Sequence, residues 1–303
     1  MFETSTINSQ YPLVSIIVVS YNASETIIET LDSIKSQTYS PIELIIADDH
    51  SSDDTAIKCK YWLDKNSDRF VNSKLIVNEK NLGVSANLNI GIQASSGEWI
   101  KNFGDDILVS DAIEKNVDYA ATLNDCNIIV SKLKRFVDKT KKELDTIPTD
   151  DYQFPASNHL QYIANLKSKL MVPSPTWFFK RDLYDRLGGF NEHFRLSEDV
   201  PFTFKLLESG FFFSYMPKIT VLYRVKQNSL SNNKGLTNKQ KQPYFESRSS
   251  VYYELQVPAL KKNKLYGVLI RKNLWFYFYK QKIHSRDHSL ARYFYGALCA
   301  ILS

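Results

Sequence analysis

The sequence has few cysteines and no obvious metal-ligand spacing. Three Cys occur among the 303 residues, far apart at positions 59, 126 and 299. An odd and widely spaced set predicts neither a disulfide framework nor a cysteine metal site, and it suits a reducing compartment. Metal-ligand spacing is also absent from His159, His193, His284 and His288.

Long apolar runs are missing as well. No stretch approaches the roughly 18 consecutive apolar residues that a transmembrane helix needs. The first twelve residues are mostly polar and lack the apolar segment of a signal peptide. We therefore expect a cytoplasmic protein, without excluding a position at the inner face of the membrane.

Net positive charge is confined to the C-terminal segment. The chain has 38 Lys and Arg against 33 Asp and Glu. Residues 259–303 hold nine of the basic residues and a single acid, a net charge of +8, so the rest of the chain is slightly acidic. The body therefore lacks the basic surface of a nucleic-acid-binding protein, and no nucleic-acid partner is expected. Hydrophobic residues at 43% are typical of a globular protein.

Short β-branched runs alternate with helical segments in the first 110 residues. The runs predict strands at residues 13–20, 41–47, 74–78 and 98–103. The first helix is expected to begin with Asn22 as its N-cap, followed by an apolar stripe from Ile27 to Ile34. This alternation predicts an α/β fold with a mostly parallel sheet, right-handed crossovers and flanking helices.

Pairs of acidic residues follow two of these strands. Asp48 and Asp49 come at the end of the second strand, and Asp105 and Asp106 follow the fourth. Each pair alone is equally typical of a turn or a helix N-terminus. Ligands of parallel sheets bind outside the carboxyl ends of the strands, where both pairs are expected to lie. The sequence therefore favours a ligand site at this edge.

The second half of the chain is less regular. A strand is predicted at 128–137 and a helix at 159–170, whereas residues 228–244 are polar and predict a loop or linker. The tail carries five consecutive aromatic residues within 269–283 and an amphipathic helical stripe within 289–303. Two alternatives stay open for it. It packs on the rest of the protein or on a second copy, or it lies on a membrane surface whose anionic lipids attract its positive charge.

Five segments together resemble the inverting family 2 glycosyltransferases. In chain order they are VSIIVVSYN, ADDHSSDDT, NLGVSANLNIGI, NFGDDIL, and LGGFNEHF followed by SEDVPF. The resemblance covers about residues 12–230 and implies the nucleotide-sugar-binding fold called GT-A, with a helical, aromatic-rich and basic C-terminal extension added here. It implies inverting sugar transfer from a UDP-linked nucleoside diphosphate donor to a glycan or lipid-linked acceptor, in bacterial surface polysaccharide assembly. The implied cofactor is Mn²⁺ or Mg²⁺.

The resemblance also implies roles for individual residues. Asp199 would be the general base, with Glu198 as the alternative, and Asp106 would bind the metal together with Asp105. Nucleotide-sugar binding is implied for Ser20, Tyr21, Asn22, Asp48, Asp49, Asn81, Gly83, Asp105 and Arg224. Apart from the resemblance, Trp177 and Arg195 are weak candidates for the acceptor side. Trp177 would stack on an acceptor sugar, with core packing as an equal alternative. Arg195 would reach the diphosphate, with simple solvation as the alternative.

The sequence departs from the family pattern at four positions. His50 stands where Gly is usual after the Asp pair, and Leu88 replaces a common Arg. Phe103 takes the place of the first acid in a fuller motif, which leaves the final Asp pair. Lys226 stands where His is frequent, and an ammonium group has no lone pair for a metal. We therefore expect Arg224 and Lys226 to contact the diphosphate or another part of the substrate.

The resemblance divides the chain into three parts. Residues 12–110 would be the nucleotide-sugar-binding half, 111–230 the acceptor-binding half of the same domain, and 231–303 a linker and helical extension. One rival function is a nucleotidyltransferase, but the first strand is not followed by a Gly-rich basic phosphate loop. The other is an inactive sugar-nucleotide-binding or membrane-docking protein, against which an intact Asp106 and Asp199 argue.

Overall fold

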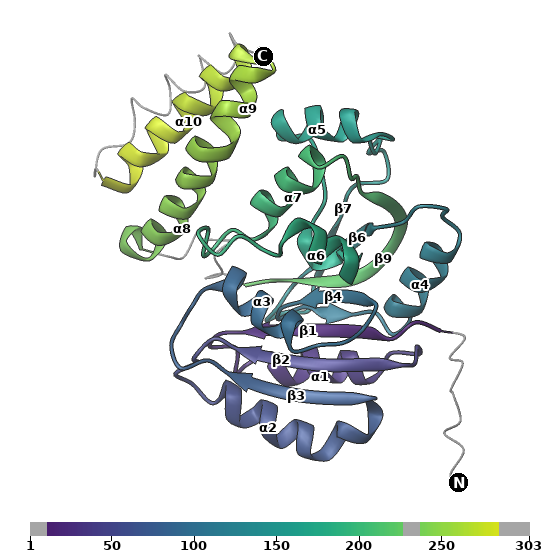
Figure 1. The fold of residues 1–303 in the computed structure, drawn as a ribbon. Coiled ribbons are helices and arrows are strands. Elements are labelled where there is room, and N and C mark those ends of the chain that lie inside the picture. The colour runs from purple at the N-terminus through teal and green to yellow at the C-terminus, as the bar shows by residue number, and fades with distance from the viewer. Residues whose placement is uncertain (1–10, 227–236, 285–303) are drawn as a thin grey trace.

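The structure is a computed structural model that describes residues 11–226 and 237–284. Within these residues the strands form a nine-stranded sheet in the order β3-β2-β1-β4-β8-β6-β9-β5, with β7 beside β6. Helices flank the sheet, and three further C-terminal helices stand beyond it (Figure 1). The predicted α/β fold with a C-terminal helical extension is confirmed.

The N-terminal half of the sheet is parallel. Its strands are β1 (Val14–Ser20), β2 (Ile42–Asp48), β3 (Asn72–Val77) and β4 (Trp99–Phe103). Its helices are α1 (Ile27–Lys35), α2 (Thr55–Asn66) and α3 (Val84–Gln93). Because successive side chains of β1 point to opposite faces, Ile16 joins the core beneath α1 and α2 while Ile17 joins the core beneath α3. Helices thus cover both faces, which explains the continuous apolar run of β1.

The second half of the sheet mixes strand directions. Its strands are β5 (Ile107–Leu108), β6 (Ile128–Val137), β7 (Glu143–Ile147), β8 (Phe178–Lys180) and β9 (Ser214–Val225). The helices are α4 (Ala112–Ala121), α5 (Asn158–Leu166), α6 (Arg181–Leu187) and α7 (Asp199–Glu208). β8 runs antiparallel to both β4 and β6, whereas β6 and β9 are parallel. This arrangement brings the start of α7 to the edge where β1 and β4 end.

The C-terminal extension contains α8 (Asn238–Val251), a π-helical segment (Tyr252–Gln256), α9 (Val257–Lys262) and α10 (Tyr266–His284). The predicted loop at 228–244 is therefore helical in its last part. Buried apolar side chains of the extension, including Tyr252, Leu260 and Phe276, form a cluster with Leu166 and Phe204 of α5 and α7. The part of the aromatic run that this cluster includes thus packs on the rest of the protein. The stripe within 289–303 lies outside the described residues.

Two local findings qualify the predictions. Asn22 is not the N-cap of the first helix, because α1 begins at Ile27 with Thr26 in the cap position. Asn22 instead adopts a left-handed backbone, with φ of 49°. In the part of the chain that the structure describes, no helix is long and apolar enough to cross a membrane.

Candidate active site

A cavity of about 1040 Å³ opens where the parallel strands end. It is lined by the residues that follow β1 and β4, by the start of α7, by the end of β9, and by side chains of α8 and α10. Its volume is at the upper end of the range of about 300–1,000 Å³ found for small-molecule pockets. The cavity therefore has room for more than one small molecule.

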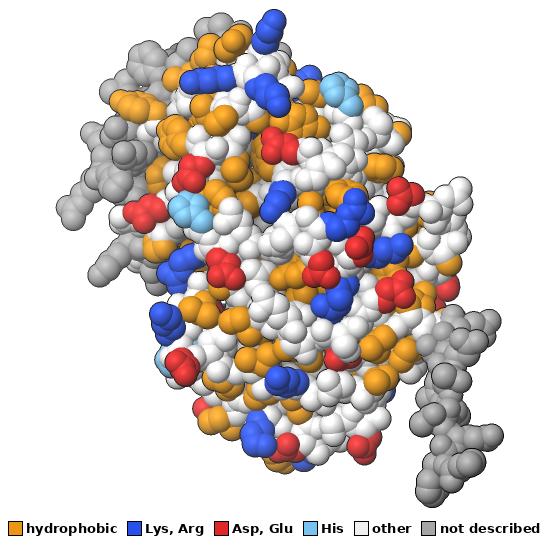
Figure 2. Space-filling model, viewed as in Figure 1, with side chains coloured by type: hydrophobic (Ala, Val, Ile, Leu, Met, Phe, Trp, Pro, Cys, Tyr) orange, Lys and Arg blue, Asp and Glu red, His pale blue; other side chains and the backbone are white. Residues whose placement is uncertain are grey.

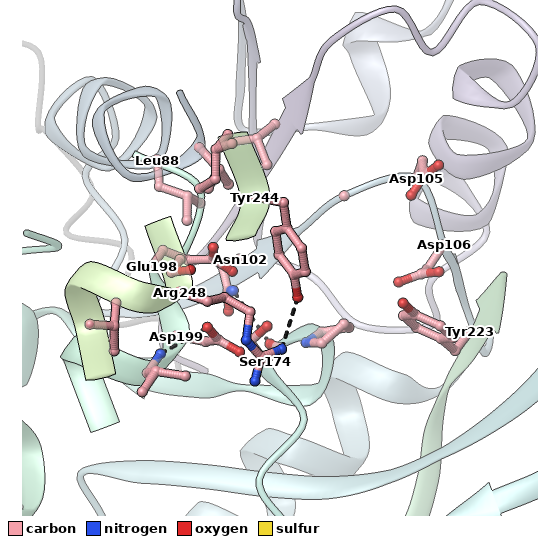
Figure 3. Close-up of a pocket in the computed structure, with 18 of the residues that line it drawn as sticks. Leu88, Asn102, Asp105, Asp106, Ser174, Glu198, Asp199, Tyr223, Tyr244 and Arg248 are labelled. Carbon is pink, nitrogen blue, oxygen red and sulfur yellow. Dashed lines mark hydrogen bonds between the residues drawn. The ribbon is translucent and has the colours of Figure 1, made fainter. Parts of the chain in front are cut away.

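Two pairs of carboxylates face this cavity from different sides. Asp105 and Asp106 lie on the side of β4 and β9, and Glu198 and Asp199 lie across from them at the start of α7 (Figure 3). The sequence predicted both pairs as site residues, and the fold brings them to one cavity. A bound molecule can therefore meet carboxylates on two sides.

Asp106 is the more buried member of its pair. Its side chain is 4% exposed, and its Oδ1 accepts a hydrogen bond of 2.8 Å from the backbone N–H of Arg224. Burial and the neighbouring charge of Asp105 raise the pKa of Asp106 to about 7, although the charges of Arg224 and Lys101 act in the opposite direction. The positive charges near Asp106 are therefore too few to offset the cost of ionising its carboxyl group at this buried position.

Arg224 and Lys226 approach the same pair from β9. The guanidinium group of Arg224 is buried, donates through Nε to the backbone oxygen of Asp105 at 2.8 Å, and forms ion pairs with Glu29 and Asp138. Lys226 donates from Nζ to the carboxylate of Asp105. Both cations thus lie beside the acidic pair, and each already has a carboxylate partner.

Glu198 and Asp199 lie at the N-terminus of α7. Oδ1 of Asp199 accepts a hydrogen bond of 2.8 Å from the backbone N–H of Val200. Burial raises the pKa of both carboxyl groups, and for Glu198 the adjacent charge of Asp199 adds to the effect, so its pKa is about 8. The pair can therefore hold a proton near neutral pH, as a proton-transferring group must.

The residues that follow β1 form another side of the cavity. Ser20, Tyr21 and Asn22 line it, and Tyr21 is 53% exposed. Asp48 is fully buried beneath them and accepts hydrogen bonds from Ser20 Oγ at 3.0 Å and from the backbone N–H of Ser51 at 2.8 Å. Asp48 therefore joins the ends of β1 and β2.

Asp49 is buried and binds the loop before α3. Its carboxylate accepts backbone N–H bonds from Leu82 and Gly83, each at 2.8 Å, and an amide bond from Asn78 at 3.0 Å. Asp49 is 4% exposed and is not among the residues that line the cavity, so its carboxylate holds the loop in place beside it. The next residue, His50, adopts a left-handed backbone with φ of 64°. His50 thus keeps a conformation that Gly adopts most easily.

Arg195 also binds this loop. Its guanidinium group donates to the backbone oxygens of Leu82 at 3.0 Å and of Asn81 at 2.9 Å. These contacts direct the guanidinium of Arg195 to the loop beside Asn81, and the weak acceptor role of Arg195 stays a prediction.

Gly83 has no room for a side chain. Its φ is +93°, and a Cβ atom there would lie 2.7 Å from the backbone oxygen of Arg195. We expect Gly83→Ala to lower the free energy of unfolding by about 2 kcal/mol or more, through backbone strain and overpacking. Urea denaturation of both proteins measures this change.

Gly267→Ala is the matched control for that substitution. Gly267 lies in α10, and a Cβ there would meet no atom within 4 Å. Alanine at this position is therefore expected to raise the free energy of unfolding, by up to about 1 kcal/mol. An unchanged stability of Gly83→Ala would contradict the described loop geometry.

Trp177 is a core residue. Its side chain is 0% exposed, its ring packs against Phe202 and Phe213 at centroid distances of 5.7 and 5.6 Å, and its Nε1 donates to the backbone oxygen of Val172. Of the two alternatives for Trp177, core packing is the one that the structure supports. Stacking on an acceptor sugar is excluded in this arrangement, because the ring has no exposed face.

Sequence reasoning missed cavity residues from the C-terminal helices. Arg248 of α8 projects into the cavity beside Asp199 and donates to the hydroxyl of Tyr244 at 3.1 Å (Figure 3). The segment around it is polar and has no periodic apolar stripe, so no sequence signal linked it to the strands. Lys101 does not line the cavity, but its charge acts on Asp106, and the sequence offered a signal for it as a lysine inside an apolar strand. It is fully buried and donates to backbone oxygens of Pro175 and Trp177.

Comparisons with known proteins identify the relatives of this chain. Residues 15–188 match the family model described as Glycosyl transferase family 2. An uncharacterized glycosyltransferase of Haemophilus influenzae is 30% identical over 224 residues, which cover 73% of this chain and 68% of that protein. The Escherichia coli protein WfaP, named a UDP-Glc:alpha-D-GlcNAc-diphosphoundecaprenol beta-1,3-glucosyltransferase, is 29% identical over 227 residues, covering 73% of this chain and 81% of that protein.

One solved structure is similar over nearly the whole chain. The mannosyltransferase PcManGT from Pyrobaculum calidifontis, in complex with GDP-Man and Mn²⁺, matches with a TM-score of 0.63 and 17% identity. The match covers 97% of this chain and 81% of that one. At this identity the likeness concerns the fold, and it extends to the C-terminal helices.

Proposed function

The chain belongs to glycosyl transferase family 2, and we propose that it inverts the anomeric carbon of a sugar while moving it from a UDP-linked donor to a glycan or lipid-linked acceptor. The observation that carries this proposal is the cavity with carboxylate pairs on two sides. An inverting displacement needs a group that stabilises the departing diphosphate on one face of the sugar. It also needs a base for the acceptor hydroxyl on the other face.

The donor end of the cavity is proposed to lie at the ends of β1 and β4. Ser20, Tyr21 and Asn22 would line the base and ribose. Asp49, held by the backbone N–H groups of Leu82 and Gly83, would accept from the base. Asn81 and Gly83 would keep the loop beside it in place. The choice of UDP rests on the name of the Escherichia coli relative.

The residues of this end fit a divalent metal ion. Asp106 is buried with a raised pKa, and Asp105 lies next to it, so a cation would offset the repulsion between them. No third carboxylate, His or Cys joins this pair among residues 11–226 and 237–284. Mg²⁺ commonly uses one or two carboxylates together with substrate phosphates and waters, which suits the pair. A cation bound there would supply positive charge to the departing diphosphate.

Arg224 and Lys226 are proposed to assist at the same end. They are paired with Glu29, Asp138 and Asp105, which fixes their positions beside the place for the diphosphate. Phosphate oxygens form strong charge-assisted hydrogen bonds with such groups. Their contribution is positive charge and orientation rather than metal ligation.

The general base is proposed to be Asp199, with Glu198 as the alternative. A base must face the acceptor hydroxyl and exist in its ionised form. The backbone N–H of Val200 and the charge of Arg248 both favour the ionised form of Asp199, although burial opposes them. The charge of Asp199 adds to burial in raising the pKa of Glu198, to about 8, so an ionised Asp199 keeps Glu198 protonated. This favours Asp199 as the proton acceptor.

This assignment predicts a pH dependence. The pKa of each carboxyl group is raised above its ordinary value, so the protonated and inactive form of the base persists to a higher pH than usual. We expect kcat/KM for transfer to rise with pH through an acid limb that lies above the ordinary range of an aspartate, with a slope of about tenfold per pH unit. UDP binding measured over the same range separates donor binding from the chemistry. A flat profile would contradict a raised pKa for the base.

The three predicted parts of the chain remain part of the proposal. Residues 12–110 would bind the donor, and 111–230 would supply the base and the acceptor side. The extension of 231–303 would close the cavity, and the basic tail would contact either a membrane surface or a second copy. The net charge of +8 in residues 259–303 supports contact of the tail with a membrane surface rich in anionic lipids.

Release of UDP tests the proposed function. The protein is incubated with a panel of UDP-sugars and Mn²⁺, with and without glycan acceptors, and UDP is measured by a coupled assay. Slow release without acceptor and faster release with one of them are expected for a glycosyltransferase. Binding of UDP without any release would favour the inactive sugar-nucleotide-binding alternative, and release of pyrophosphate would favour a nucleotidyltransferase.

A further inference from the structure

The C-terminal helices add a basic wall to the cavity. Arg248 of α8 and Arg271 and Lys272 of α10 line the same space as Asp199. Arg248 lies on the side of Glu198 and Asp199, across the cavity from Asp105 and Asp106 (Figure 3). This wall, defined as Arg248, Arg271 and Lys272, therefore belongs to the end opposite the proposed diphosphate site.

The basic wall forms no ion pair in the part of the chain that the structure describes, although Arg248 lies beside Asp199 and its charge acts on that carboxylate. Within residues 11–226 and 237–284, no carboxylate lies within ion-pair distance of Arg248, Arg271 or Lys272. Two of these side chains donate hydrogen bonds to neutral groups. Arg248 donates to the Tyr244 hydroxyl at 3.1 Å, and Lys272 donates to the Gln256 amide oxygen at 2.6 Å. The two cations of β9, by contrast, are each paired with a carboxylate. Arg271 and Lys272 therefore keep their positive charge available to a ligand, and Arg248 shares its charge with Asp199.

The three cations lie close enough to repel one another. Burial, followed by the charges of Arg248 and Arg271, lowers the pKa of Lys272 to about 8. A cluster of like charges that is partly removed from water destabilises the unliganded protein. An anion placed among the three groups would remove this repulsion.

We propose that the acceptor carries a phosphate or diphosphate group, which the basic wall binds while the acceptor hydroxyl faces Asp199. This inference rests on the proposed function, because the donor phosphates are assigned to the opposite end. Two guanidinium groups and an ammonium group match the charge and the oxygen geometry of a diphosphate. Trp275 and Phe276 line the cavity from the same helix and offer apolar surface to a hydrocarbon chain attached to that group.

The test uses the full chain with the donor site occupied. With saturating UDP and equal Mg²⁺ in cell and syringe, isothermal titration measures the binding of geranyl diphosphate, inorganic pyrophosphate and geraniol. The test variant is Arg248→Gln with Lys272→Gln. The matched control is Lys261→Gln with Lys262→Gln, which removes two exposed charges from the same extension. Thermal denaturation and UDP binding verify that every variant is folded.

We expect geranyl diphosphate to bind the wild type and the control alike, and the test variant at least about tenfold more weakly. Tighter binding of geranyl diphosphate than of pyrophosphate would identify a lipid-linked phosphate, and equal binding a phosphate without a lipid. Equal binding of the diphosphates to wild type and test variant would overturn the inference, as would weaker binding of UDP to the test variant. Failure of UDP to bind the wild type would instead overturn the proposed function.

Discussion

Asp199→Asn is expected to lower the rate of sugar transfer by about 10²–10⁴-fold, the contribution of a positioned base. Asparagine has nearly the same shape and keeps an oxygen that accepts the hydrogen bond from the Val200 N–H. It has no carboxylate to take the acceptor proton, so the loss concerns kcat rather than donor binding. Initial rates of transfer and titration with UDP measure the two quantities separately.

Glu198→Gln distinguishes the two assignments of the base. If Asp199 is the base, this variant retains most of the transfer activity and its acid limb stays in place, because the ionised Asp199 keeps Glu198 protonated and Gln is neutral as well. If Glu198→Gln instead lowers the transfer rate by about 10²–10⁴-fold while Asp199→Asn stays active, Glu198 is the base. Full activity in both variants would exclude a carboxylate base at this position.

Asp106→Asn is expected to abolish the effect of Mn²⁺ on UDP binding and to lower transfer at least about 10²-fold. The amide keeps an oxygen that accepts from the backbone N–H of Arg224, so the end of β9 stays in place. The negative charge that would bind the metal is lost. The affinity for UDP with and without Mn²⁺ is the direct measurement, since it does not depend on turnover.

Asp145→Asn provides the control. Asp145 is a half-exposed carboxylate on β7 that pairs with Arg135. Removing its charge is expected to leave the Mn²⁺ effect on UDP binding unchanged. An Asp106→Asn protein that still binds UDP more tightly with Mn²⁺ than without it would contradict the assignment of the metal to this pair.

The sheet and its acidic edge were predictable from local sequence. The apolar run of 13–20 predicts β1 because a strand covered on both faces has no polar side. Acidic pairs that follow two such strands meet at one edge, because parallel strands share their carboxyl ends. Asp105 and Asp106 accordingly line the cavity, and Asp199 joins them from a distant segment.

Other features depend on contacts that no local pattern encodes. Asn22 resembles a helix cap in sequence, but its side chain accepts from the backbone of Ser52, and the helix begins later. Trp177 follows a Pro-rich turn that suggests an exposed position, yet it packs among other aromatic rings. Arg248 reaches the cavity because α8 packs through Phe245 against α10, a tertiary arrangement without a periodic signal.

The central claim is that the cavity binds a UDP-linked donor with the help of a divalent metal ion. Thermal denaturation with UDP, GDP, CDP or ADP, each with and without Mn²⁺, tests this claim most directly. At about 100 times the dissociation constant, a bound ligand stabilises the folded state by about 2.7 kcal/mol, which corresponds to roughly 5 °C in Tm for a protein of this size. We predict such a rise with UDP and Mn²⁺ and a much smaller one with UDP alone. No rise with any nucleotide, or equal rises with and without Mn²⁺, would contradict the claim.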